Sequence, residues 1–233
     1  MTGIEAILQA MSSPPENPWL GIPAEEYEGH MEAVGQSAAL REIFERVVAE
    51  ARPRRVAVLG CSTGGDLARL DPTRLERAAG VDLNPRYLDL ARARLPELGP
   101  RLNLVHGDVL QVELPDAGRY DLIHAALLLE HVEPRALLRR IEAWLGPSGV
   151  CSLVTQEPAT QPSVSETPFT SLRALSAHMT VRAAGEIAAL ADEAGFALAS
   201  RRTVKLPSGK ALVSSIFDKA RKTLGRRRGY ARC

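Results

Sequence analysis

The sequence predicts an α/β fold in which a mostly parallel sheet is covered by helices on both faces. Short runs rich in valine, isoleucine and leucine alternate with longer segments of helical periodicity. The first apolar run ends in a cluster of glycines that leads into a polar segment. The last two β-prone runs are joined by a Pro-Ser-Gly turn, which is typical of an antiparallel hairpin. A chain of 233 residues is long enough for one such domain with an additional N-terminal arm.

Five apolar runs are expected to form the parallel part of the sheet. They are short and mostly apolar, as strands buried on both faces are. The expected strands are residues 55–59, 79–82, 102–106, 121–125 and 149–155. The closing hairpin is expected within residues 196–218.

Helices are expected between these strands. Asn84 and Pro85 are typical of the start of a helix, and Gly146-Pro147 is typical of an end. The expected helices are residues 64–70, 85–95, 134–146 and 183–195. Residues 156–172 are rich in proline, serine and threonine, which predicts a long loop across the top of the sheet.

The two ends of the chain differ from the middle. Residues 1–50 are expected to form an arm that acts as a lid, and its last part, about 34–50, an amphipathic helix packed on the edge of the sheet. Residues 51–218 would form the main domain. Residues 219–233 form a basic tail that we expect to be disordered and solvated, with contact to nucleic acid as the less favoured alternative.

The composition is that of an ordinary globular protein. Hydrophobic residues make up 45% and charged residues 24%, and no apolar run approaches the roughly 18 residues of a membrane helix. The start of the chain lacks the pattern of a secretory signal. The cysteines Cys61, Cys151 and Cys233 are far apart, which argues against a zinc site and a disulfide framework. We expect a soluble, cytoplasmic protein without membrane partners or a bound metal.

The glycine cluster after the first strand indicates a ligand site. A strand that ends in glycines and opens a helix presents backbone N–H groups to a ligand at the carboxyl edge of the sheet. The spacing Gly60-x-Ser62-x-x-Gly65 nearly matches a dinucleotide fingerprint, which by itself is a weak signal.

Two aspartates strengthen this signal. Asp82 ends the second strand, where a carboxylate accepts the hydroxyl hydrogens of a ribose, although it could also cap the helix that follows. Asp108 follows the third strand, where it can accept from an adenine amino group, or simply form a Gly-Asp turn. The three features together favour an adenosine-containing ligand.

The chain resembles the class I S-adenosylmethionine-dependent methyltransferases. The stretches "LGCSTGGDL", "GVDLNP", "HGDV" and "YDLIHAALLLEHVEP" stand in the order and spacing of that family. The resemblance implies a Rossmann-like, doubly wound seven-stranded sheet, mostly parallel with a reversed final strand in a C-terminal hairpin. It also implies S-adenosylmethionine as the cofactor and methyl transfer, which we expect to reach an oxygen or nitrogen atom of a small molecule.

The resemblance also implies roles for single residues. Residues expected to contact the cofactor are Gly60, Ser62, Thr63 and Gly64 at its methionine part, Asp82 and Leu83 at the ribose and adenine, Asp108 and Val109 at the adenine edge, and His124 and Ala125 below the sulfonium. Two positions depart from the family pattern. Val58 stands where an acidic residue is common and Ser62 where a glycine is common, so the cofactor ammonium needs another partner, such as Asp66, Glu130, backbone carbonyls or the arm.

Catalytic and acceptor-binding residues are less clearly indicated. Tyr27, His30 and Met31 share one face at helical spacing, either to cap the sheet or to form a lid in which His30 accepts a proton. Glu130 and Gln156 follow the fourth and fifth strands and are further candidates for orienting the acceptor. Cys61 has no arrangement that supports a nucleophile.

Three other functions stay open at this point. The same chemistry could act on RNA or another polyanion, guided by the basic tail. The glycine pattern and Asp82 also suit an NAD-dependent oxidoreductase. A non-catalytic cofactor-binding protein is compatible with Val58. Neither the acceptor nor the oligomeric state follows from the sequence.

Overall fold

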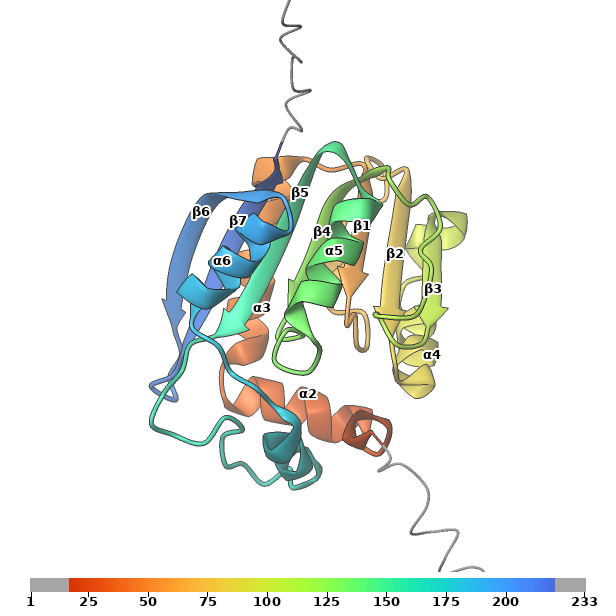
Figure 1. Cartoon of the computed structure of the whole chain (residues 1–233). Helices are drawn as coiled ribbons and strands as arrows, with labels where there is room; N and C mark the ends of the chain where they lie inside the picture. The colour runs from red at the N-terminus through yellow and green to blue at the C-terminus, as the bar shows by residue number, and fades with distance from the viewer. Residues whose placement is uncertain (1–16, 221–233) are drawn as a thin grey trace, which may run out of the picture.

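The computed structural model describes residues 17–220 of the chain. It consists of one twisted sheet with helices on both faces (Figure 1). The strands are β1 Arg55–Leu59, β2 Arg77–Asp82, β3 Leu102–His106, β4 Tyr120–Ala126, β5 Leu145–Gln156, β6 Phe196–Lys205 and β7 Ala211–Lys219. The α-helices are α2 Ala24–Ala33, α3 Gln36–Ala51, α4 Pro85–Arg94, α5 Pro134–Trp144 and α6 Ala184–Glu193. The 3-10 helices are η1 Pro18–Leu20, η2 Leu67–Arg69, η3 Pro96–Arg101 and η4 Ser171–His178.

The sheet confirms the predicted fold class. Its seven strands follow the order β3-β2-β1-β4-β5-β7-β6, and β7 runs antiparallel to both of its neighbours. The order reverses between β1 and β4, which pair in parallel. In open α/β sheets, ligands bind beyond the carboxyl ends of the strands at such a switch point.

Each face of the sheet has its own hydrophobic core. Helices α5 and α6 cover one face, where Leu138, Ile141 and Ile187 are buried. Helices α3 and α4 cover the other, where Phe44 and Leu88 are buried. The burial of both sheet faces explains why the central strands are almost continuously apolar.

Helix α3 lies elsewhere than predicted. The ring of Phe44 lies 4.9 Å from the ring of His124, which belongs to the central strand β4. The helix therefore covers the middle of one sheet face, and the expectation that it packs on the edge was wrong. Its apolar stripe is wide enough to bury Ile43, Phe44 and Val47 at once.

The helix expected after the glycines is only the short η2, Leu67–Arg69. Leu70 is already extended, and the proline at position 72 disfavours a helical conformation at Asp71. Asp71 also accepts hydrogen bonds from the backbone N–H and the hydroxyl of Thr73, which fixes a turn there.

The long loop predicted for residues 156–172 crosses the carboxyl ends of the strands, beside α2 (Figure 1). It ends in η4, Ser171–His178, which the sequence did not predict. The predicted basic tail falls almost entirely on residues outside the described part, although Lys219 still belongs to β7. Within residues 17–220, no helix combines the length and apolarity needed to span a bilayer.

Candidate functional site

A cavity of about 880 Å³ lies at the carboxyl ends of the first strands. Its volume is within the range of about 300–1,000 Å³ that is usual for small-molecule sites. One side, here called the strand-tip wall, consists of the loops that follow β1, β2 and β3. Its lining residues are Gly60, Cys61, Ser62, Thr63, Gly65, Asp66, Asp82, Leu83, Gly107, Asp108 and Val109.

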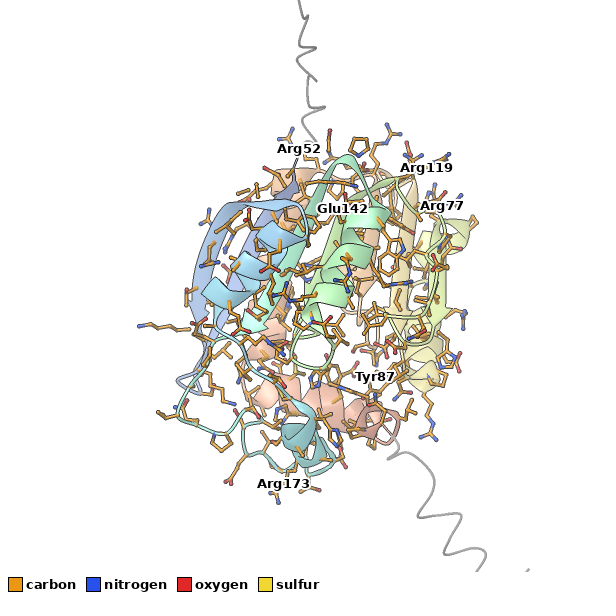
Figure 2. The ribbon with its side chains drawn as sticks, viewed as in Figure 1. Arg52, Arg77, Tyr87, Arg119, Glu142 and Arg173 are labelled. Atoms are coloured by element: carbon orange, nitrogen blue, oxygen red, sulfur yellow. The ribbon has the colours of Figure 1, made fainter. Side chains whose placement is uncertain are left out.

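The opposite side of the cavity is here called the cover. It consists of η1, α2 and residues 157–183, which we call the lid segment. Figure 1 shows α2 and the lid segment together beyond the strand ends. In Figure 2, Tyr87 lies at this end of the sheet, whereas Arg52, Arg77 and Arg119 lie at the opposite end. The cavity therefore lies between two walls with different origins in the sequence. Residues of α3 and of the segment after β4 complete its lining.

The glycine loop is held in shape by Asp82. Gly60 has φ +68° and Ser62 has φ +50°, a conformation that is unusual for a residue with a side chain. The backbone N–H of Ser62 donates to Oδ2 of Asp82 at 2.8 Å. The carboxylate on β2 thus stabilises a strained position in the loop after β1, where the family pattern has glycine.

Asp82 also meets the start of the next helix. Its Oδ1 accepts from the backbone N–H of Asn84 at 2.9 Å, while the side chain of Asn84 caps α4 by accepting from Arg86 N–H at 3.0 Å. The helix cap is therefore Asn84. Burial raises the pKa of Asp82, and its two oxygens retain lone pairs for hydroxyl donors in the cavity.

Asp108 forms the turn that the sequence offered as one of its two roles, and it lies at the cavity. Its Oδ1 accepts from the backbone N–H of Leu110 at 2.8 Å, which forms a turn after Gly107. Asp108 and Val109 both line the cavity as well. The turn therefore presents the carboxylate and the following residue to the same space as Asp82.

The residues predicted on one face of the arm do come together in the cover. Tyr27, His30 and Met31 lie on α2 and line the cavity. The imidazole Nδ1 of His30 lies 2.9 Å from Oγ1 of Thr167 in the lid segment. Burial, and to a smaller extent the charge of Lys210, lowers the pKa of His30. His30 is therefore a neutral imidazole near pH 7.

Glu28 is a residue that sequence reasoning missed. Its carboxylate accepts from the hydroxyl of Thr63 at 2.6 Å and pairs with Arg94 on α4. It thereby ties the cover to the glycine loop. On α2 alone Glu28 resembles any solvated residue, and only the fold brings it to Thr63.

Gly64 does not line the cavity. It has φ +89°, and a Cβ at this position would lie 3.0 Å from Cβ of Ala91 on α4. Gly65, by contrast, lines the cavity, and a Cβ added there would meet no atom within 4 Å. The close packing of the loop on α4 explains the need for glycine at position 64.

His124 and Ala125 are not among the residues that line the cavity either. Both are fully buried in β4, with His124 directed towards α3 and Ala125 towards α5. His124 Nδ1 lies 3.0 Å from Ser152 Oγ, and burial lowers its pKa to about 4. The chain reaches the cavity at Ala126, the last residue of β4, and at Leu127 and Leu128, which follow the strand.

Glu130 also lies outside the cavity lining, whereas Gln156 is part of it. Oε1 of Glu130 accepts from the backbone N–H of Gln156 at 2.7 Å, and its carbonyl accepts from Thr180 N–H at 2.7 Å. Burial raises the pKa of Glu130 to about 7. Glu130 therefore joins β5 to the end of the lid segment.

Asp66 is a third acidic residue beside the glycine loop. It lines the cavity together with Arg41 and Arg69, and its Oδ2 lies 3.6 Å from Nε2 of His124. Because His124 is neutral, this contact is not an ion pair. Burial raises the pKa of Asp66 to about 7, and Arg69 partly opposes that shift.

Comparison with known proteins places these features in context. A family model described as "Methyltransferase domain" matches residues 27–201. A ubiquinone biosynthesis O-methyltransferase of Vibrio campbellii is 30% identical over 97 residues, 41% of each chain. A carboxy-S-adenosyl-L-methionine synthase of Chromohalobacter salexigens is 35% identical over 113 residues, 46% of this chain and 41% of its own. The matches thus cover less than half the length of these relatives.

Solved structures share the fold. The Burkholderia thailandensis 1,6-didemethyltoxoflavin-N1-methyltransferase, solved with 1,6-didemethyltoxoflavin and S-adenosylhomocysteine, superposes with a TM-score of 0.64. It is 20% identical, and the match covers 90% of this chain and 93% of that one. The fold of most of this chain therefore recurs in a known structure.

Proposed function

The chain belongs to the methyltransferase domain family, and on that premise we propose that it transfers a methyl group from S-adenosylmethionine to an oxygen or nitrogen atom of a small molecule. The observation that carries this proposal is the convergence of the glycine loop, Asp82 and Asp108 on one cavity beneath a cover. A cavity of about 880 Å³ has the size that is usual for small-molecule sites, which favours a small acceptor over a polymer.

The strand-tip wall fits the cofactor. Asp82 would accept the ribose hydroxyls, and the turn at Asp108 and Val109 would meet the adenine edge. Gly65 leaves open space at the loop, so a ligand can approach its backbone closely. The methionine part carries one ammonium and one carboxylate group. Asp66 would pair with the former and Arg41 or Arg69 with the latter.

The reaction is an in-line displacement at carbon. When bound, the cofactor supplies an electrophilic methyl group on a sulfonium. The acceptor atom would form a bond to this carbon as the carbon–sulfur bond breaks, and the electron pair of the broken bond would remain on sulfur, giving S-adenosylhomocysteine. The protein aligns the acceptor and excludes water. His30, neutral and facing the cavity, would take the proton that the acceptor loses.

Calorimetric titration with S-adenosylmethionine, S-adenosylhomocysteine and NAD tests the cofactor assignment. We expect both sulfur nucleosides to bind with a Kd below about 100 µM, and NAD not to bind. Binding of NAD alone would favour an oxidoreductase, and no binding of any of the three would contradict the proposal. Deletion of residues 221–233 should leave the titration unchanged. A loss of RNA binding on that deletion would instead favour a polyanionic acceptor.

A further inference from the structure

The lid segment presents an uncharged surface to the cavity. Its lining side chains are Ser163, Val164, Ser165, Leu172, Leu175 and Met179. The same segment, all of which the structure describes, contains the charged residues Glu157, Glu166, Arg173 and Arg182, and none of these lines the cavity. Figure 2 shows Arg173 on the outer side of the molecule. The segment therefore separates its charged side chains from its cavity side.

Aromatic rings extend this uncharged surface. The ring of Trp19 lies 5.1 Å from that of His131 and 6.0 Å from that of Tyr27, both in edge-to-face arrangements. Trp19 and Tyr27 also pack against the small hydrophobic cluster that contains Leu172 and Leu175. Burial lowers the pKa of His131 to about 4, so this ring is neutral. All three rings line the cavity, and aromatic pairs gain roughly 0.5–1.5 kcal/mol beyond the area they bury, which favours an aromatic guest.

A charged acceptor would be poorly stabilised at this surface. An ammonium or carboxylate placed against the lid segment gains no partner of opposite charge from that segment. The charged side chains that line the cavity come from other elements, among them Glu28 and Glu32 on α2 and Arg41 on α3. Lys210 is a buried cation beside the lid segment, but its Nζ donates to the carbonyl of Ser163 at 2.8 Å and it does not line the cavity. Its charge acts instead on His30, whose pKa it helps to lower. A neutral imidazole is suited to accept a hydrogen bond, and then a proton, from a hydroxyl group.

We propose that the methyl acceptor is an uncharged, flat aromatic compound that carries a hydroxyl group, bound between the strand-tip wall and the lid segment. The proposal rests on the proposed function for the transfer itself. In that transfer the hydroxyl oxygen forms the bond to the methyl carbon, and the hydroxyl proton passes to His30. The products are a neutral methyl ether, S-adenosylhomocysteine and a protonated imidazole, so charge and protons balance.

Three probes that share a naphthalene ring and differ in the charge of one substituent test the charge preference. The probes 2-naphthol, 2-naphthoate and 2-naphthylmethylammonium are neutral, anionic and cationic at pH 7. Each is titrated calorimetrically into the full chain, with and without saturating S-adenosylhomocysteine. We expect 2-naphthol to bind at least about tenfold more tightly than either charged probe in both series, because the charged groups lose hydration without compensation.

A variant and its matched control locate the binding to the lid segment. Met179 is half-buried and lines the cavity, whereas Ala174 is exposed on the same segment and does not. Met179→Lys should raise the affinity for 2-naphthoate at least about tenfold and lower the affinity for 2-naphthol. Ala174→Lys adds the same charge outside the cavity and should change neither of these two affinities. Unchanged binding of S-adenosylhomocysteine in both variants would show that the fold is retained.

The outcomes separate the two proposals. If S-adenosylhomocysteine does not bind, the proposed function is contradicted, while the titrations without it still test the charge preference. If it binds but a charged probe binds as tightly as 2-naphthol, or none of the three binds, the inference about the acceptor is overturned. The same follows if Met179→Lys and Ala174→Lys behave alike.

Discussion

The two walls of the cavity differ in how they are built. The strand-tip wall consists of backbone turns fixed by carboxylates, as in the contact of Asp82 with the N–H of Ser62 at 2.8 Å. The cover consists mainly of apolar and aromatic side chains, such as Leu172, Leu175 and Trp19, which come from distant parts of the chain. We therefore expect hydrogen-bond geometry to select the cofactor, and the shape and uncharged lining of the lid segment to select the acceptor.

The largest effect is expected at the strand-tip wall. Asp82→Asn keeps the size of the side chain but places an amide N–H₂ where a carboxylate oxygen accepts from Ser62 or Asn84. Loss of the charge and of an acceptor should weaken S-adenosylhomocysteine binding by roughly 100-fold, as measured by calorimetry. Asp89 is exposed on α4, and Asp89→Asn is the matched control, which should bind S-adenosylhomocysteine as tightly as the unchanged protein. An unchanged affinity in Asp82→Asn would mean that the cofactor is held elsewhere.

A second substitution should affect the cover alone. His30→Gln removes the group that would accept the proton, which should lower kcat by about 100-fold with 2-naphthol as acceptor. The affinity for S-adenosylhomocysteine should not change, because His30 belongs to the opposite wall. Release of S-adenosylhomocysteine measures the rate, and His178→Gln is the control because His178 is exposed and does not line the cavity. Equal rates in both variants would remove His30 from the mechanism.

The adjacent glycines Gly64 and Gly65 are expected to respond differently to substitution by alanine. Gly64→Ala should lower the free energy of unfolding by roughly 2 kcal/mol, because the left-handed φ and the contact with Ala91 both oppose a Cβ. Gly65→Ala should change it by less than about 0.5 kcal/mol, since a Cβ there meets no atom within 4 Å. Urea denaturation measures both. Similar losses would contradict the packing role of Gly64.

The smallest expected effect concerns pH. Because the pKa of Asp66 is raised to about 7, the empty protein holds this proton more tightly than the unfolded chain does. The resulting stabilisation is complete below the ordinary pKa of 3.8 and is lost as the pH rises through 7. A bound ammonium group favours the ionised carboxylate. The affinity for S-adenosylhomocysteine should therefore rise about tenfold between pH 6 and 8.

Asp66→Asn should abolish this rise. Glu130→Gln is a stringent control, since the pKa of Glu130 is also raised to about 7 but the residue lies outside the cavity lining. It should retain the rise. If the rise disappears in Glu130→Gln and persists in Asp66→Asn, Asp66 does not bind the ammonium group.

Local signals in the sequence predicted the sheet and much of the strand-tip wall. The apolar runs identified every strand, and Asp82 and Asp108 follow their strands closely enough for position alone to place them at the cavity. The turn before α4 was also predictable, because Asn84 and Pro85 act through neighbouring backbone atoms.

Features that depend on side-chain direction or on distant partners were not predictable in this way. His124 and Ala125 lie at the end of β4, but alternation along the strand turns them towards the two helix layers. The contact between Glu28 and Thr63 joins residues that only the fold brings together. The same holds for the placement of α3, whose apolar stripe could pack equally well on an edge or on a face.

The central claim is that one cavity holds the cofactor on its strand-tip wall and leaves the lid segment free for the acceptor. A crystal structure with S-adenosylhomocysteine tests this most directly. We predict that the ribose hydroxyls lie within hydrogen-bond distance of Asp82 and that Leu172, Leu175 and Met179 do not contact the nucleoside. A nucleoside packed against those three side chains, with Asp82 directed away from it, would contradict the account.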